Sequence, residues 1–161
     1  MADGSSERAG PGEGDPAPKF QAKTDDGRTI GLDDLKGRKV VLYFYPRDDT
    51  PGCTKEACGF RDLHTELEKA GARVLGVSPD STDSHRRFKE KYGLDFTLLA
   101  DEDQEVAQAF GVWVKKKTFG REHWGVERST FIIDEEGVIQ RAWRKVKPAE
   151  HPEEVLRALT S

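Results

Sequence analysis

The chain has 161 residues, of which 35 % are charged, and its 26 Lys and Arg against 30 Asp and Glu give a formal net charge of −4. This acidic balance argues against a nucleic-acid-binding protein, which needs a clustered basic face. No apolar run approaches the roughly 18 residues that a membrane-spanning helix requires. The length fits one domain that buries a substantial core.

The first 17 residues combine Gly, Pro, Ser and acidic residues with almost no apolar side chains. This composition predicts a disordered tail over residues 1–17, and residues 18–161 are then expected to form the domain. The tail lacks the apolar segment of a secretory signal and the Arg-rich composition of a transit peptide. We therefore expect a cytoplasmic protein, in which disulfides rarely serve as structural links.

Strand and helix patterns alternate along the rest of the chain. An Asp-Gly pair at residues 26–27 predicts an early β-hairpin. Continuous apolar runs predict buried strands over residues 38–46, 72–80 and 96–101. Helical spacing and terminal signals predict helices over residues 54–70, 81–93, 101–111 and 151–161. Two antiparallel strands are expected within residues 126–144, so the order of elements predicts an α/β fold.

Several polar features have unremarkable explanations. The basic run with aromatic residues at 114–124 is expected to be a solvated loop in this acidic chain. His64 and His85 lie in predicted helices and are expected to be solvated. Asp48 and Asp49 lack the further hard oxygen ligands of a cation site, so we expect them to cap the loop or face solvent.

Both cysteines lie just after the first long strand, in the segment PRDDTPGCTKEAC at residues 46–58. Three interpretations are open for Cys53 and Cys58: semi-buried structural residues, zinc ligands, or a reactive thiol with a resolving partner. The spacing, the absence of a second Cys pair and four scattered histidines disfavour zinc. Catalytic groups of open α/β sheets gather at the carboxyl ends of strands, where Cys53 falls.

A reactive thiol fits this position best. Unpaired N–H groups and the positive dipole end at a helix N-terminus favour a thiolate. Thr50 adds a hydroxyl that can donate to or accept from a group beside the sulfur. In a regular helix the Cα atoms of Cys53 and Cys58 lie about 8.6 Å apart, whereas a disulfide needs about 7 Å or less. Joining the two cysteines therefore requires the helix to unwind.

The segment YFYPRDDTPGCTKEAC resembles the active-site segment of peroxiredoxins, whose P-x-x-x-T/S-x-x-C pattern is met by Pro46, Thr50 and Cys53. The second cysteine, five positions later, resembles the arrangement of the Q-type branch, the bacterioferritin comigratory proteins. The segments YGLDFTLLAD, FGVW and GVERSTFIID are also similar to that branch. The resemblance extends from about residue 17 to the C-terminus.

This resemblance implies a thioredoxin-like fold, with a central mixed β-sheet flanked by helices and an N-terminal β-hairpin. It implies a thiol peroxidase that reduces hydrogen peroxide and organic hydroperoxides, needs no cofactor or metal, is recycled by thioredoxin or a similar dithiol reductant, and is a monomer. The matched positions are Cys53 as the peroxidatic cysteine, Cys58 as the resolving cysteine, Thr50 as the hydroxyl that binds peroxide, Pro46 as the shield of the pocket, and Arg128 as the arginine that completes the site.

Two other functions use the same residues. The pair Cys53 and Cys58 could serve a thiol–disulfide oxidoreductase or a redox sensor without peroxidase turnover. The fold could also serve as a non-catalytic thioredoxin-like binding module. Rapid thiol loss with peroxide separates a peroxidase from both.

Overall fold

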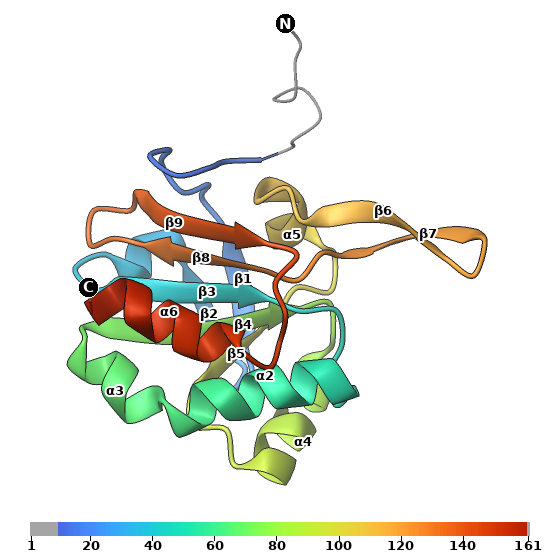
Figure 1. Cartoon of the computed structure of the whole chain (residues 1–161), viewed down its shortest axis with the longest axis horizontal. Coiled ribbons are helices and arrows are strands. Elements are labelled where there is room, and N and C mark those ends of the chain that lie inside the picture. Colours follow the sequence, from blue (N-terminus) through green and yellow to red (C-terminus); the bar gives the residue numbers. More distant parts are fainter. Residues whose placement is uncertain (1–9, 161) are drawn as a thin grey trace, which may run out of the picture.

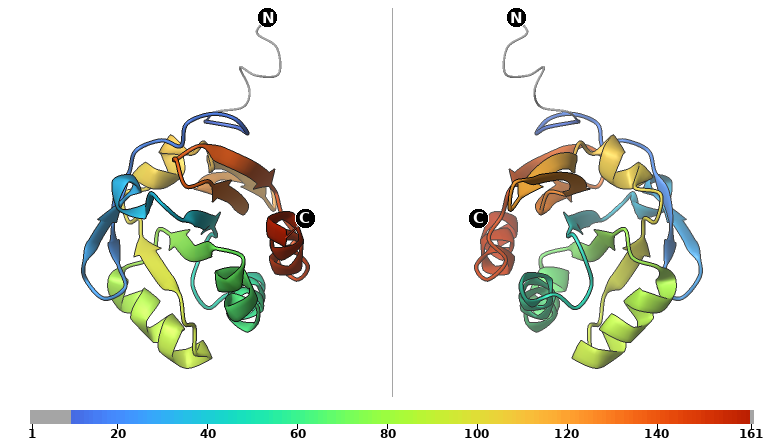
Figure 2. Two further views of the ribbon diagram at one scale, coloured as in Figure 1. Left: turned by 90° about the vertical axis from the view of Figure 1, so that its left-hand side faces the viewer. Right: turned by 90° about the vertical axis from the view of Figure 1, so that its right-hand side faces the viewer.

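The computed structural model describes residues 10–160, which form a seven-stranded sheet, helices on both of its faces, and a separate two-stranded hairpin (Figures 1 and 2). The strands are β1 (Gln21–Thr24), β2 (Thr29–Gly31), β3 (Lys39–Phe44), β4 (Ala72–Ser78), β5 (Thr97–Ala100), β6 (Trp113–Thr118), β7 (Arg121–Val126), β8 (Ser129–Ile133) and β9 (Ile139–Arg144). The helices are the 3-10 helix η1 (Leu32–Leu35), α2 (Pro51–Asp62), α3 (His64–Lys69), α4 (Thr82–Tyr92), α5 (Glu105–Ala109) and α6 (His151–Thr160).

The large sheet has the strand order β2-β1-β5-β4-β3-β8-β9. Its three central strands, β3, β4 and β5, are parallel, whereas β1, β8 and β9 run antiparallel to their neighbours. The predicted mixed sheet and the N-terminal hairpin of β1 and β2 are therefore confirmed. In the register of β3 with β8, Phe44 lies opposite Ser129, so β8 begins where β3 ends.

Each face of the sheet carries its own apolar core. Along β3, Leu42 and Phe44 belong to the core that η1 and α5 cover, whereas Tyr43 belongs to the core beneath α2, α3, α4 and α6. This alternation follows from the period of two along a strand whose two faces are both buried. Cys53 belongs to the second core, on the α2 side.

The predicted helix over residues 54–70 is observed as two helices, α2 and α3, with a break at Leu63. α2 begins at Pro51, a residue whose fixed φ and missing N–H suit the first helical position. Cys53 is therefore in the first turn, as predicted. The predicted ends of α4 are also confirmed, since Ser81 accepts a hydrogen bond from the Ser84 N–H and Gly93 has a φ of 63°.

The expectation of a solvated loop at residues 114–124 is wrong. These residues lie in the hairpin of β6 and β7, which projects from the body of the molecule (Figure 1). Phe119 and Gly120 turn the chain with positive φ values of 53° and 79°, the conformation that tight two-residue hairpin turns require. Most side chains of β6 and β7 are exposed or half-buried. The two strands therefore lack the alternation of apolar and polar residues by which a strand is predicted from sequence.

Part of the predicted N-terminal tail has a defined place. The Ala17 N–H donates to the Gly137 carbonyl over 2.8 Å, and the Ile139 N–H donates to the Asp15 carbonyl over 2.9 Å. Residues 10–17 therefore lie beside the β8–β9 turn and the start of β9, while residues 1–9 are outside the described part of the chain. Within residues 10–160, no helix has the length and apolar character needed to cross a membrane.

Candidate active site

Cys53 lies in the first turn of α2 and is only 1 % exposed. The Thr50 carbonyl accepts a hydrogen bond from the Thr54 N–H over 2.8 Å, which places Thr50 at the N-cap of the helix. The thiol is thus next to the helix end whose N–H groups and dipole favour negative charge.

Arg128 contacts this thiol directly. Its Nη2 donates a hydrogen bond to Cys53 Sγ over 3.3 Å. Arg128 immediately precedes β8, and the register of β3 with β8 brings that point to the end of β3, from which the chain leads into α2. The expected proximity of Arg128 to Cys53 is therefore observed, and it depends on strand pairing between distant segments.

Glu56 is a third member of the site that sequence reasoning missed. It lies one helical turn after Cys53, its side chain has no exposed surface, and its Oε1 accepts a hydrogen bond from Arg128 Nη1 over 2.7 Å. The guanidinium thus contacts the carboxylate and the sulfur with different nitrogens. The sequence could have indicated Glu56, because a spacing of three residues in a helix places its side chain on the same face as Cys53.

The environment of Glu56 raises the pKa of its carboxyl group. Burial raises the pKa of Glu56 to about 7, and the positive charge and hydrogen bond of Arg128 oppose that shift. The second carboxylate oxygen, Oε2, is buried without a hydrogen-bond partner among the described residues. Glu56 therefore changes its charge near neutral pH, within one hydrogen bond of the arginine that contacts Cys53.

Gly52 allows this close packing. A Cβ on Gly52 would lie 3.2 Å from Arg128 Nη2 and 3.4 Å from Pro148 Cγ. A side chain at position 52 would therefore press on the guanidinium, which would have to shift by a few tenths of an ångström. The Gly in the segment TPGC lets Arg128 approach the first turn of the helix.

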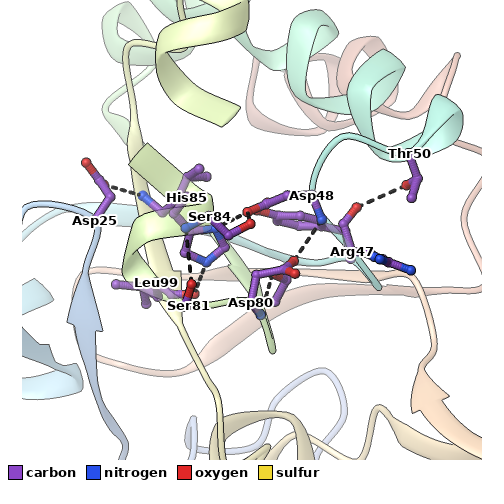
Figure 3. Close-up of polar contacts among 12 residues, drawn as sticks. Asp25, Arg47, Asp48, Thr50, Asp80, Ser81, Ser84, His85 and Leu99 are labelled. Atoms are coloured by element: carbon purple, nitrogen blue, oxygen red, sulfur yellow. Dashed lines mark hydrogen bonds and ion pairs between the residues drawn. The ribbon is translucent and has the colours of Figure 1, made fainter. Parts of the chain in front are cut away.

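Of the other predicted site residues, Pro46 and Thr50 precede the first turn of α2 and Cys58 follows it. Thr50 Oγ1 donates to the Arg47 carbonyl over 3.0 Å, which leaves its oxygen lone pairs able to accept a hydrogen bond (Figure 3). Pro46 lies two residues after the end of β3 and is half-buried. Cys58 is a free, partly exposed thiol in the same unbroken helix as Cys53, which is also a free thiol.

Asp48 and His85 form a buried polar network beside the site, so the expectation that His85 is solvated is wrong. The His85 side chain has no exposed surface, and its Nδ1 lies 2.7 Å from Asp48 Oδ2. Tyr45 and Ser84 also donate to the Asp48 carboxylate, over 2.6 and 2.8 Å. Figure 3 shows Asp48 and His85 facing each other, with Asp80 joined to the Asp48 backbone N–H.

Ligand atoms of Asp48, Asp80 and His85 lie within 4.8 Å of one another, as in a small metal site. Each residue, however, already makes hydrogen bonds in the structure. Asp80 Oδ2 accepts from the Asp48 N–H over 2.7 Å and from Ser78 Oγ over 2.7 Å. These contacts describe a hydrogen-bonding network that fastens the loop before α2.

The model of the AhpC/TSA family matches residues 13–142 of the chain. The chain belongs to the AhpC/TSA family. It is 58 % identical over 146 residues to a putative peroxiredoxin bcp of Coxiella burnetii, covering 91 % of this chain and 97 % of that protein. It is 52 % identical to the peroxiredoxin Bcp of Bacillus subtilis, with 91 % and 93 % covered.

Solved structures agree with this assignment. Peroxiredoxin Q of Xanthomonas campestris superposes with a TM-score of 0.84 at 44 % identity, covering 88 % of this chain and 89 % of that one. A cysteine-to-serine variant of PrxQ from Xylella fastidiosa gives a TM-score of 0.87 at 38 % identity, with 92 % and 94 % covered. The predicted thioredoxin-like fold and the Q-type resemblance are confirmed. As a peroxiredoxin, the chain is a thiol peroxidase.

Proposed function

We propose that the chain reduces hydrogen peroxide and organic hydroperoxides with the thiolate of Cys53, and that Cys58 then resolves the oxidised sulfur. The observation that carries the proposal is the 3.3 Å hydrogen bond from Arg128 Nη2 to a buried sulfur in the first turn of α2. A related protein supports the substrate class, since a solved structure of the Xanthomonas campestris bacterioferritin comigratory protein concerns its alkyl peroxide reduction activity.

In the first step the Cys53 thiolate attacks the terminal oxygen of the hydroperoxide. A sulfur–oxygen bond forms, the oxygen–oxygen bond breaks, and the departing alkoxide or hydroxide takes up one proton to leave as alcohol or water. Cys53 becomes a sulfenic acid. Arg128 is permanently charged, so it can stabilise both the thiolate and the negative charge that grows on the departing oxygen.

The remaining roles follow from position. The lone pairs of Thr50 Oγ1 can accept a hydrogen bond from the peroxide, and half-buried Pro46 takes the shielding role that the family resemblance implies. Glu56 holds the Arg128 guanidinium by a charge-assisted hydrogen bond. No metal or cofactor takes part in this scheme.

In the second step the Cys58 thiol condenses with the sulfenic acid, a disulfide forms and water leaves. Both cysteines lie within α2, and regular helix geometry separates their Cα atoms by about 8.6 Å. The first turns of α2 therefore unwind before the bond can form. A dithiol reductant, for which we propose thioredoxin or a similar protein, then restores both thiols and is itself oxidised to a disulfide.

A stopped-flow experiment tests the first step. Reduced protein is mixed with hydrogen peroxide or an alkyl hydroperoxide, and thiol loss is followed together with the mass of the alkylated product. We expect thiol loss much faster than that of free cysteine. A rate no faster than free cysteine would contradict the peroxidase function and would favour an oxidoreductase or sensor.

Two cysteine variants separate the roles. Cys58→Ser should consume one equivalent of peroxide and stop at the sulfenic acid, detected as a dimedone adduct on Cys53. Cys53→Ser should consume essentially none, although Cys58 remains. Equal peroxide consumption by the two variants would contradict the assigned roles. A cytoplasmic location and a monomeric state, expected from the sequence, stay predictions.

A further inference from the structure

The segment between β3 and α2, residues 45–50, is here called the cysteine loop, because it leads directly into the turn that holds Cys53. Its buried anchor is Asp48, whose side chain is 4 % exposed. One carboxylate oxygen accepts from Tyr45, and the other accepts from Ser84 and faces His85. The carboxylate thereby ties the loop to the N-terminal part of α4.

The hydrogen-bond partners of His85 determine where its protons lie. Its Nε2 is 2.9 Å from the Leu99 carbonyl, which can only accept, so Nε2 carries a proton. Its Nδ1 is 2.7 Å from Asp48 Oδ2, and that contact needs one further proton between the two atoms. The pair is thus an imidazolium facing a carboxylate, or its neutral equivalent with the proton on oxygen. In either form a hydrogen bond joins the loop to α4.

A second contact to α4 is exposed. Asp49 accepts from Tyr92 Oη over 2.7 Å and forms an ion pair with Lys91 Nζ over 2.8 Å, near the C-terminal end of the helix. Solvent-exposed ion pairs contribute little. The buried contacts of Asp48 with Ser84 and His85 are therefore expected to constrain the cysteine loop against α4 more than the exposed contacts of Asp49 do.

We propose that Asp48 and His85 are positioning residues for the peroxidase reaction. The hydrogen bond between them fixes the cysteine loop so that the Thr50 carbonyl starts α2 and the first-turn N–H groups, together with Arg128, remain aligned on Cys53. This inference rests on the proposed function, because its consequence is a rate of reaction with peroxide. It assigns a catalytic consequence to a histidine outside the reacting centre.

Four variants test the bond itself. His85→Gln keeps an amide donor near the position of Nε2, for the Leu99 carbonyl, and removes the donor to Asp48. His85→Asn does the reverse, because its amide lies near the position of Nδ1. Asp48→Ala removes the bond from the other side, whereas Asp48→Asn can donate to an unprotonated Nδ1 and so keep it.

The control is Asp101→Ala. Asp101 is also a buried carboxylate, and it accepts the N–H groups of Val106 and Ala107 at the start of α5 instead of holding the cysteine loop. The variants and the control are compared with wild-type protein in stopped-flow oxidation. The peroxide-dependent step and the later, peroxide-independent formation of the disulfide are measured separately, with melting temperatures for every protein.

We expect Asp48→Ala and His85→Gln to slow the peroxide-dependent step about tenfold to a hundredfold, the range expected when a hydrogen bond to a charged group is lost. Asp48→Asn and His85→Asn should stay within about threefold of wild type. Disulfide formation should not slow in any of the four, because it needs α2 to unwind. Asp101→Ala should lower the melting temperature without this selective loss.

Equal rates of the peroxide-dependent step in His85→Gln and His85→Asn would overturn the inference. A loss of this rate that follows the drop in melting temperature across all variants and the control would also overturn it. If Asp48→Ala fails to fold, the two His85 variants decide. A wild-type protein without a fast peroxide-dependent step would contradict the proposed function itself. A fast wild-type step that His85→Gln leaves unchanged would contradict only the positioning role.

Discussion

Arg128 and Glu56 form a part-buried ion pair, with Nη1 and Oε1 2.7 Å apart, while the other terminal nitrogen of the same guanidinium contacts Cys53. The Glu56 side chain has no exposed surface, and that of Arg128 has 16 %. A planar guanidinium held at one nitrogen by a fixed carboxylate presents its second nitrogen in a fixed direction. Glu56 therefore orients the donor that stabilises the reacting sulfur.

The first prediction concerns the stability of the Glu56→Gln variant. Burial raises the pKa of Glu56 from 4.5 to about 7, so the folded protein binds this proton more tightly than the unfolded chain. The contribution of Glu56 to stability is thus fully present below about pH 4.5 and is lost as the pH rises through 7. The shift corresponds to about 3 kcal/mol.

Because Gln does not titrate, the free energy of unfolding of Glu56→Gln relative to wild type should rise by up to about 3 kcal/mol between acidic and mildly alkaline pH. Urea titrations at several pH values measure this difference, in which the contributions of other groups cancel. A difference that stays constant with pH would contradict the raised pKa of Glu56.

The second prediction concerns Arg128. Arg128→Lys keeps the charge but offers one ammonium group, which cannot hold Glu56 and Cys53 from two separate nitrogens. We expect the peroxide-dependent rate to fall at least tenfold in Arg128→Lys and about a hundredfold or more in Arg128→Met. Stopped-flow rates measure this loss, and ultraviolet absorbance measures the thiolate. Wild-type rates in Arg128→Met would remove Arg128 from the mechanism.

The sequence shows the parts of the site that are local in the chain. Cys53 at a helix start, the Thr50 hydroxyl just before it and Cys58 farther along the helix all follow from one strand-to-helix junction. Glu56 could have been predicted from its spacing to Cys53. These features depend on periodicity and turn chemistry within a dozen residues.

The contacts between distant segments could not be derived from the residues alone. Arg128 was found only through the family resemblance, because its position depends on the register between β3 and β8. His85 lies in a largely polar helix, and its burial depends on a carboxylate 37 positions earlier in the chain. Both cases need the tertiary fold, since propensity and spacing do not specify which strand or loop a side chain meets.

The third prediction concerns Gly52. Ala at this position would bring a Cβ within 3.2 Å of Arg128 Nη2, which Glu56 and Cys53 already hold in place. Ala also favours the helix, so we expect Gly52→Ala to keep or raise the melting temperature. A displaced guanidinium should still slow the reaction with peroxide by about tenfold or more. Unchanged rates would show that Arg128 can move aside without consequence.

The fourth prediction concerns the opening of α2. Cys53 and Cys58 lie in one continuous helix, whose geometry keeps their Cα atoms too far apart for a disulfide. Amide hydrogen exchange in residues 53–62 should therefore rise sharply when one equivalent of peroxide converts the reduced protein to the disulfide form. Mass spectrometry of peptic fragments measures this change, and β4 serves as an internal reference because it lies in the middle of the sheet.

Cys58→Ser provides the matched control for this opening. It forms the sulfenic acid but cannot form the bond, so its exchange over residues 53–62 should stay close to that of the reduced protein after the same dose. Equal increases in Cys58→Ser and wild type would assign the opening to oxidation of Cys53 alone. Full protection of this segment in the wild-type disulfide form would mean that the two sulfurs meet without unwinding, which a regular helix does not permit.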